Sequence, residues 1–143
     1  MINRPRLDMW HHVAKIPLVA GKVKIKDFGI IKEAEMNFGP KLNIIAGKNA
    51  SGKTTALNYL IENSNLDKLS KSQQIGLQIK PGCLLIDHVL SELQPKNCLE
   101  LLKELENSEN QSIVTLPWEQ LREIKDKVHA NILYTHNFEL KHI

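Results

Sequence analysis

The chain has 143 residues, 42% hydrophobic and 24% charged, which is the composition of a soluble globular protein with one domain large enough to bury a core. Its 19 basic and 16 acidic residues leave a net charge of +3, too small to argue by itself for a nucleic-acid partner. The longest apolar runs, near residues 16–20 and 84–86, are too short to span a bilayer, and the first residues lack a signal-peptide pattern, so a cytoplasmic location is predicted.

Residues 1–20 are predicted to form an N-terminal arm, and residues 21–143 a single domain. Pro5 and Pro17 interrupt the arm and argue against one long helix. His11 and His12 are adjacent, but two histidines without further ligands are more typical of a polar surface than of a metal site.

Two stretches of alternating polar and apolar residues follow, at 22–28 and 33–38. Such alternation is typical of half-buried strands, and the glycine-containing segment between them predicts a turn. The pair is therefore predicted to be an antiparallel hairpin. Lys22, Lys24 and Lys26 share one strand face, which is interpreted as solvated rather than as a nucleic-acid surface. Gly39 and Pro40 then separate the hairpin from a buried strand at 41–46.

The stretch from Gly47 to Thr54 fits the phosphate-binding loop pattern of Gly, four residues, Gly-Lys, and Ser or Thr. A predicted strand precedes it and a predicted helix, residues 54–61, follows, as the motif requires. The glycines let successive N–H groups point at phosphate oxygens, and the helix start adds positive potential. In such a loop Lys53 reaches the β- and γ-phosphates and the Thr54 hydroxyl binds Mg²⁺.

The rest of the chain alternates strands with helices. The apolar runs predict strands at 83–87, 111–116 and 130–135, the last with a short tail, and helices at 95–105 and 117–124. This alternation predicts an α/β fold with a mainly parallel sheet flanked by helices and an N-terminal antiparallel hairpin. Cys83 and Cys98 are predicted to be reduced packing residues. Trp10 and Trp118 could each stack on a base, but Trp118 is predicted to pack in the core instead.

Asp87 ends the strand at 83–87, predicted to lie beside the phosphate-loop strand. An acid at the carboxyl end of such a strand holds Mg²⁺ through water. The residues predicted to hold Mg²⁺ are Thr54 and Asp87, and those predicted to bind the nucleotide are Gly47, Lys48, Asn49, Ala50, Ser51, Gly52, Lys53, Thr54 and Thr55.

Two segments, residues 24–57 and 80–105, resemble ABC-type P-loop ATPases of the SMC/RecF/AAA-like group. In the first, a short hairpin precedes the loop, and Asn43, Asn49 and Ser51 match the family pattern besides the general loop residues. In the second, an apolar strand ending in an acid precedes a turn called the D-loop, matched by Ser91, Leu93 and Pro95. The resemblance implies a P-loop NTPase fold, ATP and Mg²⁺ as ligands, and a site completed across a homodimer or by a larger related ATPase subunit.

The departures from this family concern hydrolysis. His88 stands where the family has a catalytic Glu that polarises the attacking water, so hydrolysis is predicted to be slow or absent. The family's histidine after the next strand is replaced by residues 115–117, and His136 is a second, less favoured candidate for that role. Residues 69–74 could be an eroded signature motif, although a polar loop or a helix cap by Ser70 is the favoured interpretation.

Two other function classes stay open. One is an assembly module in which ATP acts as a structural ligand or switch without being hydrolysed. The other is a small P-loop kinase, ranked last because such kinases need arginines in a mobile lid, and this chain has only Arg4, Arg6 and Arg122.

Overall fold

The computed structural model describes residues 13–19, 21–47, 52–63, 70–72, 75, 81–87, 95–136 and 139–142. In these ranges the strands are β1 (Val13–Ile16), β2 (Gly21–Phe28), β3 (Ile31–Phe38), β4 (Leu42–Gly47), β5 (Cys83–Ile86), β6 (Gln111–Pro117), β7 (Asn131–His136) and β8 (Glu139–His142). The longer helices are α2 (Lys53–Asn63), α4 (Pro95–Glu106) and α5 (Trp118–Ile124). The elements predicted over these ranges are confirmed within a few residues at each end.

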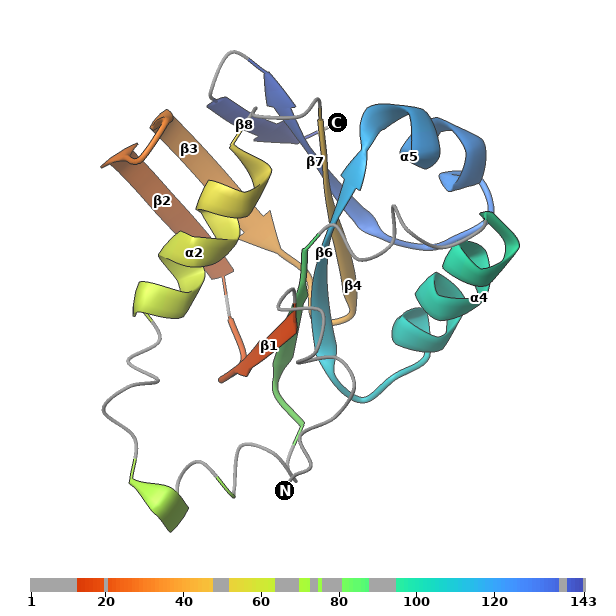
Figure 1. Cartoon of the computed structure of the whole chain (residues 1–143), viewed down its shortest axis with the longest axis horizontal. Helices are drawn as coiled ribbons and strands as arrows, with labels where there is room; N and C mark the ends of the chain where they lie inside the picture. The colour runs from red at the N-terminus through yellow and green to blue at the C-terminus, as the bar shows by residue number, and fades with distance from the viewer. Residues whose placement is uncertain are drawn as a thin grey trace.

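All eight strands form one sheet in the order β1-β5-β6-β4-β7-β8-β3-β2 (Figure 1). Its middle is parallel: β5 pairs with β6, β6 with β4, and β4 with β7. The carboxyl ends of these four strands therefore lie at one edge of the sheet, where α/β folds bind ligands. The mixed sheet with an antiparallel hairpin, β2 and β3, is the predicted fold class.

The strand order corrects one prediction. β5, which precedes Asp87, is not beside β4, because β6 lies between them. Pairs such as Ile86 with Val114 and Ala46 with Leu116 show β6 in contact with both neighbours. The chain that follows β6 consequently starts between the end of β4, which leads into the phosphate-binding loop, and the end of β5, which precedes Asp87.

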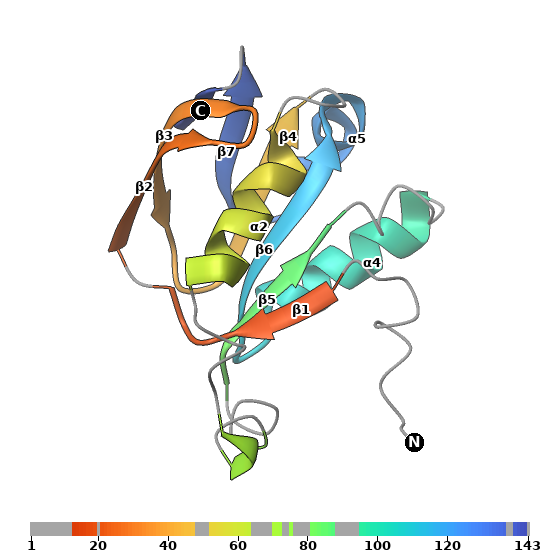
Figure 2. The same cartoon turned by 60° about the vertical axis from the view of Figure 1, so that its left-hand side comes forward.

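Two further strands come from segments that were not predicted to join the sheet. β1, from the predicted N-terminal arm, pairs antiparallel with β5 at one edge (Figure 2). β8, from the predicted tail, pairs antiparallel with β7 and parallel with β3. Because β8 stands between them, it joins the hairpin to the parallel part of the sheet.

The helices cover both faces of the sheet, as predicted. α2 lies on one side of the central strands, and α4 and α5 lie on the other (Figures 1 and 2). Residues of β4 alternate between the two cores, since Ile45 packs with the α2 side and Ile44 and Ala46 pack with the α4 and α5 side. Cys83 and Cys98 are free and buried, one in each core, as predicted for packing residues.

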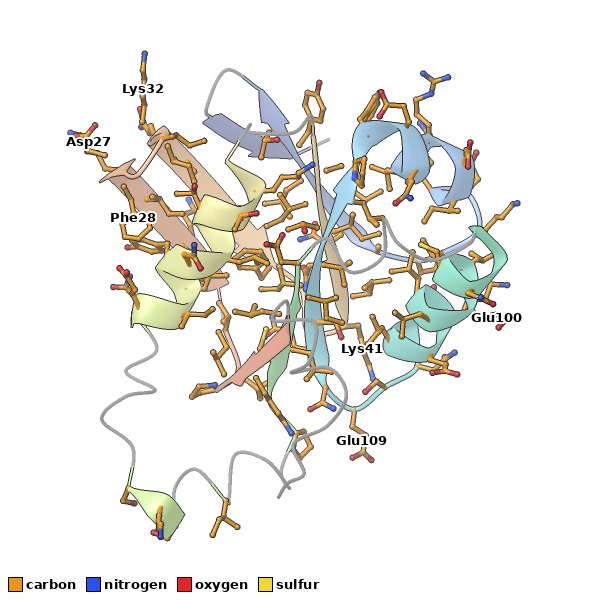
Figure 3. The ribbon with its side chains drawn as sticks, in the orientation of Figure 1. Asp27, Phe28, Lys32, Lys41, Glu100 and Glu109 are labelled. Carbon is orange, nitrogen blue, oxygen red and sulfur yellow. The ribbon has the colours of Figure 1, made fainter. Side chains whose placement is uncertain are left out.

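The hairpin packs against α2 through aromatic side chains. Phe28 meets Tyr59 edge to face, with ring centroids 5.1 Å apart, and the Tyr59 hydroxyl donates to the Lys24 carbonyl at 3.1 Å. Asp27 and Lys32 instead project from the tip of the hairpin (Figure 3). On the outer strand Lys22 forms an ion pair with Glu35, with both side chains about half exposed, which agrees with a solvated strand face. Among the helices that the structure describes, none has the length and apolar character to cross a membrane.

Candidate functional site

The two ends of the phosphate-loop motif meet at the carboxyl edge of the sheet. β4 ends at Gly47, and α2 begins at Lys53 directly after Gly52, which has a φ of +108°. This positive φ at Gly52 suits glycine, which has no Cβ to clash with the backbone. Lys48, Asn49, Ala50 and Ser51 lie outside the described residues. The chain thus turns from strand to helix at the point where the motif requires it.

The Lys53 side chain folds back onto the start of the loop. Its Nζ donates to the Gly47 carbonyl oxygen at 2.6 Å, and the residue is only 2% exposed. Burial lowers the pKa of the ammonium by removing it from water, while the nearby Asp87 and Glu119 carboxylates act in the opposite direction. A buried cation whose ammonium bonds a single backbone carbonyl in the described residues is well placed to exchange that bond for a phosphate oxygen.

The Asp87 carboxylate is held at both oxygens. Oδ2 accepts from the Thr54 hydroxyl at 2.9 Å, and Oδ1 accepts from the Thr115 hydroxyl at 2.7 Å. Thr54 is exposed and Asp87 is partly so, whereas Thr115 is fully buried. The two residues predicted to hold Mg²⁺ are therefore in direct contact, with their oxygens open to solvent on the Thr54 side.

These oxygen ligands fit the ion. Mg²⁺ usually binds one or two protein oxygens and takes its other ligands from water and substrate phosphates. In the described part of the chain no group of three or more His, Cys, Asp or Glu side chains could hold a metal on its own. A metal at Thr54 and Asp87 would accordingly take its remaining ligands from water and phosphate oxygens.

The hairpin supports the loop from behind. A Cβ on Gly52 would lie 3.1 Å from Cγ1 of Ile31, and a Cβ on Gly29 would lie 2.8 Å from Cγ2 of Thr55. Thr55, predicted to bind the nucleotide, is thus in close contact with the hairpin turn. The first turn of α2 is held between the sheet and this turn, which fixes where Lys53 and Thr54 start.

The structure adds two residues that the sequence did not single out for this site. Thr115 lies near the carboxyl end of β6, and Glu119 lies in the first turn of α5. Both reach this region because β6 lies between β4 and β5, a strand order that the sequence did not predict. A hydroxyl inside an otherwise apolar strand was the one available signal for Thr115; Glu119 resembles any exposed helical acid.

The remaining candidates divide into two groups. His88, Leu69, Ser91 and Leu93 lie outside the described residues, as do Trp10, His11 and His12, so their predicted roles stay predictions. Of residues 69–74 the structure describes 70–72, where the hydroxyls of Ser70 and Ser72 share a hydrogen bond of 3.2 Å. His136 ends β7, and β4 separates this strand from β6. His136 is therefore on the far side of β4 from Asp87.

Trp118 packs, as predicted. Its ring lies against the core beneath α5 and meets Tyr134 edge to face, with centroids 5.0 Å apart. Leu121, one turn later, is fully buried. These two anchors fix the first turn of α5 on the sheet.

An α/β sheet with a glycine loop between β4 and α2 is consistent with the P-loop ATPase-like class. The chain belongs to the AAA domain family, whose model matches residues 22–131. That range includes the hairpin, the loop, α2, Asp87 and Glu119. No curated protein matches the chain, and no solved structure matches it either. Membership of this family suggests nucleotide binding.

Proposed function

We propose that this domain binds ATP with Mg²⁺ through a Walker A loop, residues 47–54, and a Walker B acid, Asp87, and that it hydrolyses ATP slowly. In this proposal it is a reduced nucleotide-binding domain of the ABC type. The observation that carries the proposal is the contact between Thr54 and Asp87, whose oxygens are 2.9 Å apart although 33 residues separate them. A glycine turn without a ligand-binding role would not require such a contact beside the buried Lys53.

The residues present divide the work between them. The Lys53 ammonium would bind phosphate oxygens as a point charge, and the amide groups at the start of α2 would add to the positive potential. When bound, Mg²⁺ neutralises charge on the β- and γ-phosphates. The Thr115 hydroxyl orients the Asp87 carboxylate from its buried side, at 2.7 Å, and leaves the other oxygen toward Thr54. His88 in the place of the family's catalytic Glu is the reason to expect slow turnover.

Calorimetric titration with ATP and Mg²⁺ tests binding. Lys53→Ala removes the buried ammonium and should weaken ATP binding by about 1.5–3 kcal/mol, the size of a charge-assisted hydrogen bond. Lys41→Ala is a matched control, because Lys41 is exposed, bonds the Ser108 carbonyl at 3.0 Å and directly precedes β4, at the end of the strand opposite to the loop. Equal ATP affinity in the wild type and Lys53→Ala, with both folded, would overturn the proposal. Phosphate release measured beside binding separates a slow ATPase from an assembly module that only binds.

A further inference from the structure

Among the described residues that the loop motif and β5 bring to the proposed site, none is a carboxylate free to polarise the attacking water. Lys53 supplies a cation, Thr54 a hydroxyl, and Asp87 a carboxylate already engaged by two threonine hydroxyls. The next residue along the chain is His88, whose imidazole carries no negative charge in either protonation state. If the domain turns over ATP at all, another group must provide this function.

The path of β6 brings one such group to the site. Pro117, the last residue of β6, lies directly opposite Gly47 in the parallel register of the two strands. Neighbouring strands are about 4.8 Å apart, so α5 begins next to the carbonyl that Lys53 contacts. Glu119 is the second residue of α5, and its side chain is exposed.

The first turn of α5 is also anchored to the core. Trp118 and Leu121, on either side of Glu119, both pack into it. With those neighbours directed inward, Glu119 faces away from the core. Burial lowers the pKa of Lys53, and the Asp87 and Glu119 carboxylates act in the opposite direction, which agrees with the nearness of Glu119 to Lys53 that the strand register gives.

We infer that Glu119 is the catalytic carboxylate of this domain, in place of the acid that is missing after Asp87. The inference rests on the proposed function. In the step it serves, a water oxygen attacks the γ-phosphorus and the bond from that phosphorus to the bridging oxygen breaks. ADP leaves with the bond's electron pair, and the Glu119 carboxylate accepts the proton of the water. The products are ADP and inorganic phosphate.

Glu119 also has a purely structural use. An acid in the first turn of a helix is stabilised by the positive end of the helix dipole. That role alone would make Glu119→Gln slightly less stable but would not change how the protein distinguishes ATP from ADP. A carboxylate facing the γ-phosphate should, in contrast, repel ATP more than ADP. The two roles are therefore separable by nucleotide affinity.

The experiment compares the full chain with Glu119→Gln, and with Glu123→Gln as the matched control on the same helix. Glu123 is exposed and one turn further along α5. In single-turnover assays with protein in excess over ATP and Mg²⁺, Glu119→Gln should slow phosphate release by about 100-fold or more, as expected for loss of a general base. By calorimetry it should tighten ATP relative to ADP by about three- to tenfold, through loss of charge repulsion. Glu123→Gln should change neither measurement.

Each other outcome decides against the inference. Unchanged turnover in Glu119→Gln overturns it, and so does a wild type that binds ATP but releases no phosphate above the buffer control; binding through Lys53 survives both results. A wild type that fails to bind ATP removes the proposed function itself. If Glu119→Gln does not fold, Glu119→Asp keeps the charge on a shorter side chain and should slow turnover while leaving the ratio of ATP to ADP affinity unchanged.

Discussion

The oxygens of Asp87 have different surroundings, and this difference determines what the residue can do. Oδ1 is bonded to Thr115, which is fully buried in β6, so the carboxylate plane is fixed by the sheet. Oδ2 is bonded to Thr54, which is exposed at the start of α2. In the proposed function, Thr54 and the Oδ2 oxygen of Asp87 would hold the metal, and the bond from Thr115 to Oδ1 would stay in place. The buried Thr115 hydroxyl would thus position the Asp87 carboxylate for the proposed metal site.

Asp87→Asn should separate metal binding from nucleotide binding. Removing the negative charge should weaken ATP binding in the presence of Mg²⁺ by about ten- to hundredfold, as for loss of a contact with a charged group. ATP binding in the presence of a chelator should change little, because the proposed contact of Lys53 with the phosphates would remain. Calorimetry with and without Mg²⁺ measures both values. Asp126→Asn, an exposed acid after α5, serves as the control; equal losses with and without metal would indicate a folding defect instead.

At the scale of elements, the hairpin turn and α2 form one unit. Gly29 has a φ of +55° and lies so close to α2 that an added Cβ would be 2.8 Å from the Thr55 methyl. Gly21, at the other end of β2, has a φ of +74° but nothing within 4 Å of such a Cβ. The sequence predicted a turn at Gly29, but only the packing explains why a larger residue would displace the helix that carries Lys53.

The glycine pair makes this testable. Gly21→Ala should cost about 1 kcal/mol, the strain of a positive φ with a side chain. Gly29→Ala adds the clash with a β-branched side chain that rotates with difficulty, and overpacking of this kind costs a further 1–3 kcal/mol or so. Urea unfolding measures both. Thr55→Ser removes the clashing methyl and should recover most of the additional loss; equal stability of the two alanine variants would show that the turn and α2 are not tightly packed.

At the scale of the whole molecule, local patterns predicted the elements and long-range pairing decided their places. The alternation in β2 and β3 and the apolar run of β4 were sufficient to predict strands, because both reflect burial of the residues themselves. No local sequence pattern, in contrast, indicates that β6 lies between β4 and β5. Glu139–His142 is too short and polar to identify as a strand, and it forms β8 only because β7 and β3 offer it edges on both sides.

The same limit applies to the candidate site. Lys53 and Thr54 could be predicted, since the loop motif is contiguous, and Asp87 could be predicted because it ends an apolar strand. Thr115 and Glu119 reach the site through the order of strands in the sheet. Their nearness to Asp87 and Lys53 depends on pairings between residues such as Gly47 and Pro117, 70 positions apart in the sequence.

The amino ends of the central strands, opposite to the candidate site, are connected by a hydrogen-bond network centred on Asn43, which is fully buried. Its Oδ1 accepts from the Gly39 N–H at 2.7 Å and from Asn131 Nδ2 at 2.9 Å. Its Nδ2 lies within 3.2 Å of the Gly39, Lys41 and Ser112 carbonyl oxygens. Asn131 continues the network to the Asn37 carbonyl at 2.6 Å, so that one buried side chain connects the end of the hairpin with β4, β6 and β7. Asn43 is also one of the residues that match the family pattern before the loop, and its contacts give that match a structural reason.

Asn43→Ala should consequently destabilise the domain while sparing the nucleotide site. It leaves several buried donors and acceptors without partners, at a cost of roughly 2–4 kcal/mol in the free energy of unfolding. Asn107→Ala, which removes one exposed bond of 3.0 Å to the Lys103 carbonyl, should cost less than about 0.5 kcal/mol. Because Asn43 lies at the amino end of β4 and Gly47 at its carboxyl end, folded Asn43→Ala at low temperature should bind ATP and Mg²⁺ with nearly the affinity of the wild type. Urea unfolding and calorimetry on the same samples give both quantities. A small loss of stability, or a loss of ATP affinity in protein that is still folded, would mean that the two edges of the sheet are not independent and that the network helps to set the geometry of the loop.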